Sequence, residues 1–314
     1  RVGRGRRLPH RVRGPRIVSQ MDSVFAGCGY VGRQVARRER DLSGRVFAVV
    51  RSPSSAEQLI REGIQSIALD LEEISALEFS LSDKVLYWFV PPQPEGMQDR
   101  RLRRCLELAA QIGQIPKRIV LINTTGVYGD CQGDWVTETR PRRPQTGRAT
   151  RRVDAEDFAR SWCDFHAVTL VVLRVPGIYG FGKLPLDRIK NARPVLAPEL
   201  CPWSNRVHVE DLITACMSAA RIKAPAPAYN ISDGHPSTMT DFFFKVADAA
   251  GLPRPPILTT QEASAQLSKE MQSYLAESKR IDNTLMKEHL GVVPRFPDLE
   301  RGLNAIFSGL ANDG

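Results

Sequence analysis

From Asp22 onward, short apolar runs alternate along the chain with longer amphipathic stretches. The apolar runs predict strands at residues 23–27, 45–50, 64–70, 84–90, 117–125 and 167–175. The stretches between them predict helices, one ending near residue 40, one from residue 54, one at 99–112 and one carrying residues 146–156. This alternation is typical of βαβ units, and strands rich in Val, Ile and Leu are expected to be covered on both faces. We therefore expect an α/β fold, a Rossmann-type doubly wound parallel sheet.

After Val175 the pattern changes, because Gly and Pro become frequent. The elements expected here are a short strand running into a helix at 206–220, a strand at 228–233, and a helix at 237–251 that ends at Gly251. We interpret residues 21–180 as an NAD(P)-binding Rossmann domain and residues 181–314 as a smaller, mixed C-terminal substrate lobe. Residues 206–235 are expected to contribute to the Rossmann core.

The positive charge is concentrated at the start of the chain. The formal net charge is +9, and residues 1–20 hold seven arginines and no acidic residue, so the remainder carries 9 − 7 = +2. A transit peptide and a nucleic-acid-binding arm both fit this composition. We favour a third interpretation, a basic and disordered extension upstream of Met21, which directly precedes the first predicted strand. The charge therefore gives no reason to expect a nucleic-acid partner.

The cysteines show neither metal-binding spacing nor a disulfide framework. They stand at positions 28, 105, 131, 163, 201 and 216, without a C-x-x-C pair or a nearby histidine cluster. No apolar run approaches the roughly 20 residues of a membrane-spanning helix. We expect a cytoplasmic protein with no metal site, and we read Cys28 and Cys131 as packed thiols.

A glycine-rich motif follows the first predicted strand. Gly27, Gly29 and Gly32 have the G-x-G-x-x-G spacing, and they open the first predicted helix. The first glycine permits a tight turn, the second lets the backbone approach a pyrophosphate, and the third allows close helix packing. The motif predicts a dinucleotide site, to which Tyr30 and Val31 within it also belong.

The second strand is followed by Arg51, where an NAD-dependent enzyme usually offers an acid to the ribose. A guanidinium can instead bind a 2′-phosphate, so we favour NADP over NAD. An exposed loop arginine is the alternative. Asp70, at the end of the third strand, could bind an adenine amino group or could cap the helix expected after it.

Taken together, these motifs resemble the extended short-chain dehydrogenase/reductases, a family that includes the NAD-dependent nucleotide-sugar epimerases and dehydratases. The resemblance covers residues 21 to about 233 and rests on the ordered set GCGYVG, NTTGVYGD, ETRPRRP, LRVPGIYG, RVHVEDL and YNISD. It implies that the cofactor contacts Val90 and Pro91, that Val175, Pro176 and Ile178 approach the nicotinamide ribose, and that His208 lies by the substrate cleft. A structural role for His208 is the alternative that the residue type favours.

In this family a Ser or Thr hydroxyl binds the reacting oxygen, and a Tyr-x-x-x-Lys pair transfers the proton. The resemblance places Thr124 at the hydroxyl position. Counting back from Glu156, the tyrosine and lysine positions are occupied by Arg148 and Arg152. A guanidinium, with a pKa above about 12, cannot give up its proton usefully.

Arg148 and Arg152 are four residues apart on the expected helix, so they share one face and could together bind a phosphate or carboxylate. In the alternative interpretation, Arg152 pairs with Glu156 on a solvated helix face. Neither aromatic interleaving nor a continuous basic stripe supports nucleic-acid binding. Tyr128 is a further candidate for proton transfer, because its phenol has suitable chemistry.

Two functions remain open at this point. The first is an atypical NAD(P)-binding oxidoreductase or nucleotide-sugar epimerase/dehydratase-like enzyme with a small-molecule substrate, in which Thr124 orients the reacting oxygen. The second is a non-catalytic NADP(H)-binding sensor or assembly factor. A homodimer is compatible with either function.

Overall fold

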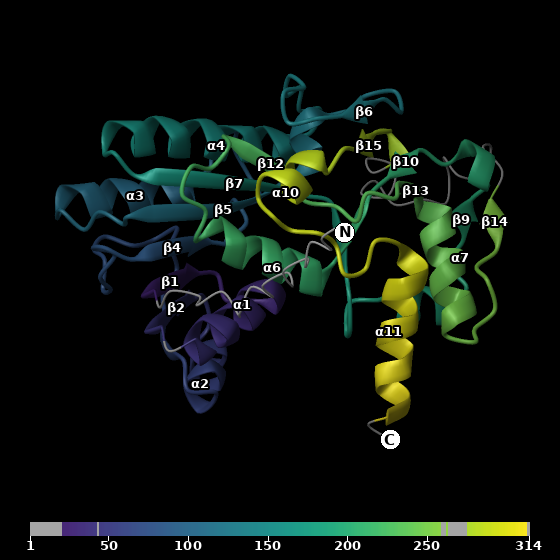
Figure 1. Ribbon diagram of the computed structural model, residues 1–314, viewed down its shortest axis with the longest axis horizontal. Helices are drawn as coiled ribbons and strands as arrows, with labels where there is room; N and C mark the ends of the chain where they lie inside the picture. Colours follow the sequence, from purple (N-terminus) through teal and green to yellow (C-terminus); the bar gives the residue numbers. More distant parts are fainter. Residues whose placement is uncertain (1–20, 43, 259–261, 263–274, 313–314) are drawn as a thin grey trace, which may run out of the picture.

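The computed structural model describes residues 21–42, 44–258, 262 and 275–312, so the basic extension expected at 1–20 lies outside the described residues. Seven parallel strands form the central sheet, in the order β12-β7-β5-β4-β1-β2-β3 (Figure 1). Their bounds are β1 Ser23–Ala26, β2 Val46–Val50, β3 Gln65–Ala68, β4 Val85–Trp88, β5 Arg118–Thr124, β7 Thr169–Val175 and β12 Ala228–Asn230. The predicted α/β fold with a doubly wound parallel sheet is confirmed.

Helices cover both faces of this sheet, as Figure 1 shows. One apolar layer is formed with α3 (Arg100–Gln111) and α4 (Gly147–Phe165). The opposite layer is formed with α1 (Tyr30–Asp41), α2 (Pro53–Arg61) and α6 (Val209–Ala219). The central strands β1, β4, β5 and β7 are therefore buried on both faces, which explains why most of their residues are apolar.

The order of the strands determines where a site can form. The chain runs outward from β1 through β2 to β3, then returns to place β4 on the other side of β1. At such a reversal the loops after neighbouring strands diverge, which opens a crevice at the carboxyl ends of the strands. The glycine motif directly follows β1, and Phe89 and Val90 directly follow β4. The motif therefore lies at this crevice.

The second half of the chain builds a smaller lobe beside the carboxyl ends of the central strands (Figure 1). Its apolar core joins α7 and α11 with residues of α5 and β9. Short strand pairs β8–β11, β10–β13, β9–β14 and β6–β15 complete the lobe and its junction with the sheet. The bounds are β6 Trp135–Val136, β8 Gly177–Tyr179, α5 Leu186–Lys190, β9 Val195–Leu196, β10 Trp203–Ser204, β11 Arg206–His208, β13 Ser237–Thr238, α7 Met239–Ala249, β14 Ile257–Leu258, β15 Arg280–Ile281, α10 Thr284–Glu288 and α11 Leu299–Asn312, with the 3-10 turns η1 Thr125–Tyr128 and η2 Pro198–Leu200.

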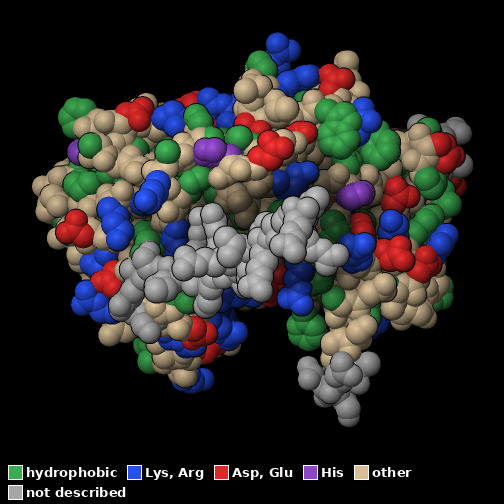
Figure 2. Space-filling model, viewed as in Figure 1, with side chains coloured by type: hydrophobic (Ala, Val, Ile, Leu, Met, Phe, Trp, Pro, Cys, Tyr) green, Lys and Arg blue, Asp and Glu red, His purple; other side chains and the backbone are tan. Residues whose placement is uncertain are grey.

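Charged side chains of both signs are interspersed over the face shown in Figure 2, and Lys and Arg do not gather into one stripe there. A continuous basic stripe is what a nucleic-acid backbone requires. Within the described ranges, every helix is too short or too polar to cross a bilayer.

Candidate functional site

Two of the three motif glycines are required by the packing of the protein itself. Gly27 has a φ of +82°, and a Cβ there would lie 2.9 Å from the backbone nitrogen of Val90. A Cβ on Gly32 would lie 2.6 Å from the carbonyl oxygen of Gly27. Any side chain at either position would force the backbone apart. These two glycines hold α1 tightly against the turn that follows β1.

Gly29 is different, because a Cβ at this position would meet nothing within 4 Å. The helix α1 begins directly after it, and the first turn of this helix carries no acidic side chain. A helix start combines free N–H groups with a positive partial charge, so it favours an anionic group. The open space at Gly29 leaves room for such a group to approach the backbone, and the residues present therefore fit a dinucleotide pyrophosphate.

The other motif residues connect this loop to its surroundings. The Tyr30 hydroxyl donates a hydrogen bond of 2.8 Å to the carbonyl oxygen of Phe181. The ammonium group of Lys183 lies 5.3 Å from the centre of the Tyr30 ring. Val31 packs against the apolar layer around α1 and α6. Tyr30 thus links the glycine loop to the segment around Lys183.

The remaining predicted cofactor residues lie at the carboxyl ends of neighbouring strands. Arg51 is exposed directly after β2, and Asp70 is exposed two residues after β3. The Asp70 carboxylate accepts a hydrogen bond of 3.0 Å from the backbone of Glu72, so it stabilises a turn; no helix follows it. Val90 adjoins Gly27, and the carbonyl oxygen of Pro91 accepts a 3.0 Å bond from Arg101.

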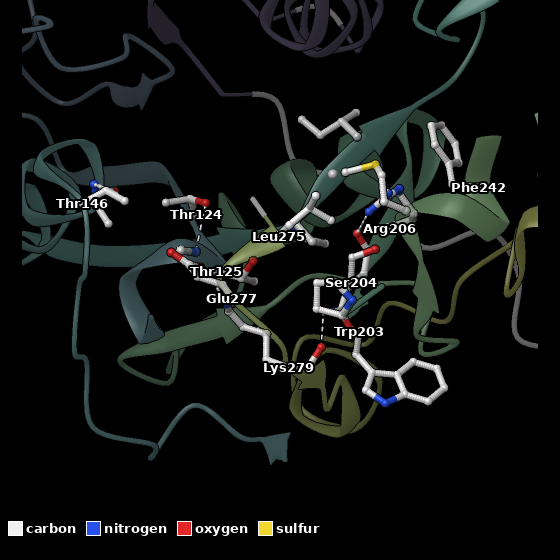
Figure 3. A pocket seen from close by; sticks show the side chains of 18 of the residues that line it. Thr124, Thr125, Thr146, Trp203, Ser204, Arg206, Phe242, Leu275, Glu277 and Lys279 are labelled. Atoms are coloured by element: carbon white, nitrogen blue, oxygen red, sulfur yellow. Dashed lines mark hydrogen bonds and ion pairs between the residues drawn. The ribbon is translucent and has the colours of Figure 1, made fainter. Parts of the chain in front are cut away.

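A cavity of about 510 Å³ lies between the carboxyl ends of β5 and β7 and the C-terminal lobe (Figure 3). Residues that the sequence singled out meet here, since Thr124, Arg148, Arg152, Pro176 and Ile178 all line it. Val175, which directly precedes Pro176 in the chain, is buried. The remaining lining residues are Thr125, Gly126, Thr146, Ala149, Gly177, Lys183, Pro185, Pro202, Trp203, Ser204, Asn205, Arg206, Met239, Phe242, Leu275, Glu277 and Lys279.

Positive charge predominates in the lining of this cavity. Among its described residues, the single carboxylate belongs to Glu277, and it forms an ion pair of 2.5 Å with Lys279. The basic side chains of the lining are Arg148, Arg152, Lys183, Arg206 and Lys279. A partly enclosed site with such an excess of cations suits a ligand that carries negative charge.

Thr124 is the hydroxyl that the resemblance places at the reacting oxygen. It ends β5, and its side-chain oxygen accepts a 3.1 Å hydrogen bond from the backbone of Gly126, which caps the η1 turn. This bond uses an acceptor lone pair, so the hydroxyl proton stays able to donate into the cavity. Thr125 lines the same wall and is largely buried.

The alternative interpretation, in which Arg152 pairs with Glu156 on a solvated helix face, is wrong. Glu156 is only 2% exposed and binds Arg174 at 2.7 Å and Arg142 at 3.2 Å. Arg152 instead donates a 3.2 Å bond to the carbonyl oxygen of Ile122. Burial lowers the pKa of Arg152 to about 10, which still leaves it cationic at neutral pH. A one-dimensional helix pattern identifies neighbours four residues apart, but it does not reveal a stronger partner on β7.

Tyr128 lies in a buried network, away from the residues that line the cavity. Its hydroxyl donates to the side-chain oxygen of Asn230 at 2.7 Å and accepts from Arg174 at 2.9 Å. Burial raises the pKa of Tyr128 to about 12, although Arg174 opposes this shift. This phenol is 1% exposed and its proton is already donated to Asn230, so it lacks the access and the free O–H that proton transfer to a cavity ligand needs.

His208 is also not among the lining residues. Its Nδ1 accepts a 3.2 Å bond from the backbone of Glu210, which caps α6, and its ring packs 4.1 Å from that of Phe296. Burial lowers the pKa of His208. The geometry matches the structural alternative for this histidine.

The cysteine thiols of the described chain are not activated. Cys28 is buried, and desolvation raises its pKa to about 12. Burial likewise raises the pKa of Cys131. No cluster of potential metal ligands occurs among the residues that the structure describes.

Several cavity residues carry no recognisable pattern in the sequence. Arg206 stands two residues before His208, so the motif RVHVEDL marks its neighbourhood but not its role. Lys183, Glu277 and Lys279 have no local signal at all. Glu277 and Lys279 stand more than 100 residues from Thr124, and only the fold brings them to the same cavity.

Comparisons with known proteins agree with this geometry. Residues 25–232 match the model of the NAD dependent epimerase/dehydratase family. Protein YeeZ of Escherichia coli K12 is 27% identical over 287 residues, which cover 88% of this chain and 96% of YeeZ.

Two solved structures show how widely the fold is shared. A conserved protein of unknown function from Silicibacter pomeroyi superposes with a TM-score of 0.78 at 29% identity, covering 92% of this chain and 99% of its own. The UDP-glucose 4-epimerase of Thermotoga maritima superposes with a TM-score of 0.76 at 19% identity, covering 93% and 99%. The family match spans well over half of the chain, which therefore belongs to the NAD-dependent epimerase/dehydratase family.

Proposed function

We propose that this protein is an NAD(P)-dependent oxidoreductase or epimerase that acts on a hydroxyl or carbonyl group of a negatively charged small molecule, such as a nucleotide sugar. The observation that carries the proposal is the cavity itself. It places the Thr124 hydroxyl on a wall shared with Arg148 and Arg152, in a lining where cations outnumber the carboxylate of Glu277. A hydroxyl for the reacting oxygen and cations for a phosphate are what such a substrate needs.

The cofactor would be held by the glycine loop, with its pyrophosphate at Gly29 and the start of α1. When bound, it supplies the hydride chemistry. Arg51, exposed at the end of β2, favours NADP, because its guanidinium can bind a 2′-phosphate. Val90 and Pro91 would line the adjoining part of the crevice, and Pro176 and Ile178 the nicotinamide end.

The fold neighbours are consistent with this substrate class. MoeE5 was solved in complex with UDP-glucose and NAD, and it superposes on this chain with a TM-score of 0.72 at 20% identity. Such a likeness concerns the fold, so the substrate proposal depends on the cations and the hydroxyl of this cavity.

A calorimetric titration with NADP⁺ and NAD⁺, followed by a turnover screen over UDP-glucose, UDP-galactose and UDP-glucuronic acid, tests the proposal. We expect micromolar binding of NADP⁺, weaker binding of NAD⁺, and turnover of at least one member of the panel. If neither NADP⁺ nor NAD⁺ binds at micromolar concentration, the proposed dependence on NAD(P) is refuted.

Two variants locate the cofactor. Gly29→Asp should abolish dinucleotide binding while leaving thermal unfolding close to that of the wild type, because the new side chain meets open space. Arg51→Asp should move the preference from NADP⁺ toward NAD⁺. Arg61→Asp, an equally exposed charge reversal at the far end of α2, serves as the matched control. Unchanged NADP⁺ affinity in Arg51→Asp would place 2′-phosphate recognition elsewhere.

A non-catalytic cofactor sensor is the second candidate, and one observation favours it. Arg148 and Arg152 occupy the tyrosine and lysine positions, and neither guanidinium can act as an acid at neutral pH. Tight NADP⁺ binding without turnover of any panel member would support the sensor over the enzyme.

A further inference from the structure

The cavity needs a group that can exchange a proton if the protein is an enzyme, and its described lining offers few. Arg148, Arg152 and Arg206 keep their protons at neutral pH. Tyr128 and His208 are absent from the lining and bonded within the protein. What remains is the exposed Lys183 on the rim and one carboxylate with its lysine partner.

That carboxylate belongs to Glu277, whose Oε2 lies 2.5 Å from the Nζ of Lys279. Both side chains line the cavity, and only 16% and 7% of their respective surfaces are exposed. In Figure 3, Lys279 extends its ammonium group toward Glu277, which is drawn beside Thr125. A carboxylate in such a sheltered place is reached by a ligand in the cavity more readily than by bulk solvent.

Residues 278 and 279, which directly follow Glu277, are held by hydrogen bonds of their backbone. The carbonyl oxygen of Ser278 accepts hydrogen bonds of 3.0 Å and 2.9 Å from the backbone nitrogens of Cys131 and Gly133. The backbone N–H of Ser278 donates a hydrogen bond of 2.8 Å to the carboxylate of Asp130. The carbonyl oxygen of Lys279 accepts a 3.0 Å bond from the side chain of Asn205.

These contacts come from two places, the loop that follows Thr124 and η1, and the residues just before β11. They tie the segment to the same loop that carries the Thr124 hydroxyl. Glu277 is therefore held in a set position relative to the cavity wall, as proton transfer requires.

We propose that Glu277 is the catalytic acid and base of this cavity, in place of the tyrosine that Arg148 replaces, and that Lys279 holds it in position. The proposal rests on the proposed function. In the oxidative direction the substrate O–H bond breaks and its proton passes to Glu277. The C–H bond on the same carbon breaks as the C=O bond forms, and its hydrogen would leave with the electron pair, as hydride, to a bound oxidised nicotinamide. Thr124 donates a hydrogen bond to the same oxygen, and the reverse direction returns the proton from Glu277.

Lys279 is a positioning residue, because its ammonium group holds the Glu277 carboxylate through the 2.5 Å ion pair. Without that partner the carboxylate can take up other rotamers, and proton transfer requires a fixed geometry. Lys279→Met should therefore lower kcat more than it changes KM, and Lys279→Arg, which keeps a cation at this position, should retain part of the kcat.

The experiment compares the wild-type protein with Glu277→Gln, Glu277→Asp and Lys279→Met, using NADP⁺ and whichever member of the nucleotide-sugar panel the wild type turns over. We expect Glu277→Gln to lower kcat by about 100-fold or more, the lower end for a positioned acid or base, with KM and NADP⁺ affinity changed only a few-fold. Glu277→Asp should keep part of the activity. Asp248→Asn, which removes an exposed carboxylate of the same lobe from its pair with Arg254, is the matched control and should match the wild type.

A second readout requires no turnover. Calorimetric titration with UDP-glucose compares its affinity for the wild type and for Glu277→Gln. The variant should bind within a few-fold of the wild type, because the assigned role of Glu277 is in proton transfer and not in holding the substrate. If Glu277→Gln fails to fold, the kcat values of Glu277→Asp and Lys279→Met test the same point.

The possible outcomes distinguish the assignment of Glu277 from the proposed function on which it rests. A wild-type protein that binds NADP⁺ but turns over no panel member overturns the proposed function, and the role of Glu277 with it. If the wild type is active and folded Glu277→Gln keeps its kcat within a few-fold, or Lys279→Met leaves kcat unchanged, only the assignment of Glu277 is overturned.

Discussion

Two groups of charged side chains lie near helix α4, and they differ in how their charges are satisfied. The enclosed cluster consists of Glu156, Arg174 and Tyr128, each less than 10% exposed and each bonded to other parts of the protein. The cavity cluster consists of Arg148, Arg152, Glu277 and Lys279, which face a hollow large enough for a ligand.

The contrast indicates what each cluster is for. Buried charges are tolerated only when they are paired and hydrogen-bonded, so the enclosed cluster is part of what holds α4 to β5 and β7. In the described lining of the cavity one carboxylate faces several basic groups, so a net positive charge borders a space that a ligand can enter. Changes in the enclosed cluster should therefore cost stability, and changes in the cavity cluster should affect binding and turnover.

The largest expected effect on stability comes from Arg174→Met. Glu156 would lose its bidentate partner while remaining buried, and breaking a buried ion pair from one side costs about 3–5 kcal/mol. Urea unfolding followed by circular dichroism measures this loss. A loss below 1 kcal/mol would show that Arg142 and Asn123 alone satisfy Glu156, and the contrast between the clusters would fail.

Asp233, which lies outside α4, provides a pH-dependent test of the idea that enclosed ionisable groups affect stability. It is 4% exposed, one carboxylate oxygen accepts a 2.9 Å bond from His235, and burial raises its pKa to about 7. Its folded-state pKa lies above the unfolded value, so below about pH 4 it is protonated in both states and contributes no pH dependence. As pH rises from about 4 to about 7 the unfolded state loses this proton first, and stability falls by roughly 1 kcal/mol per pH unit.

Asp233→Asn should remove that downward slope, and unfolding curves recorded across the window would show it. Because His208 titrates in the wild type and in the variant alike, the difference between the two proteins isolates Asp233. Parallel stability profiles for the two would mean that the buried carboxyl does not carry the slope.

Tyr128→Phe should have a smaller effect of about 1–2 kcal/mol, because it leaves Asn230 without a donor and Arg174 with one acceptor fewer. The turnover of a folded variant should stay within a few-fold of the wild type, since the phenol does not reach the cavity. With its pKa raised to about 12, Tyr128 stays protonated throughout the neutral range. A drop of 100-fold in kcat would restore Tyr128 as the proton donor.

Arg148→Ala should have the smallest effect on stability, below about 0.5 kcal/mol, because this side chain is exposed. Its effect should fall on binding, with an affinity for UDP-glucose lowered by about 10-fold, as expected for the loss of one charged hydrogen bond. Calorimetry measures the affinity, and the exposed Arg61→Ala on α2 is the control. An unchanged affinity would move the anion contact to Arg206 or Lys183.

The parts of the site that were predictable lie within short, continuous motifs. Gly27, Gly29 and Gly32 were identifiable because their spacing has a direct geometric meaning between a strand and a helix. Thr124, Arg148 and Arg152 were located by resemblance, and the cavity brings all three together. Glu277 could not be found in this way, because its proposed role depends on its place in the cavity, where the neighbouring Ser278 is bonded to Cys131 and Gly133 far away in the chain.

The pairing of Arg152 with Glu156 shows the limit most clearly. Residues four apart on a helix do share a face, and the spacing was read correctly. Spacing does not say which other element packs against that face, and here Arg174 on β7 binds Glu156. Burial strengthens the ion pair between Glu156 and Arg174. Arg152 is left with a hydrogen bond to the backbone of β5.

The sequence by itself determined the α/β class, the doubly wound sheet and the glycine loop, because periodicity and glycine geometry act between residues close together in the chain. The family followed from the resemblance of its ordered motifs. Only the tertiary structure decided which charges are enclosed and which face a ligand. Burial and charge pairing depend on what lies across a gap in space, and no local pattern in the chain records that.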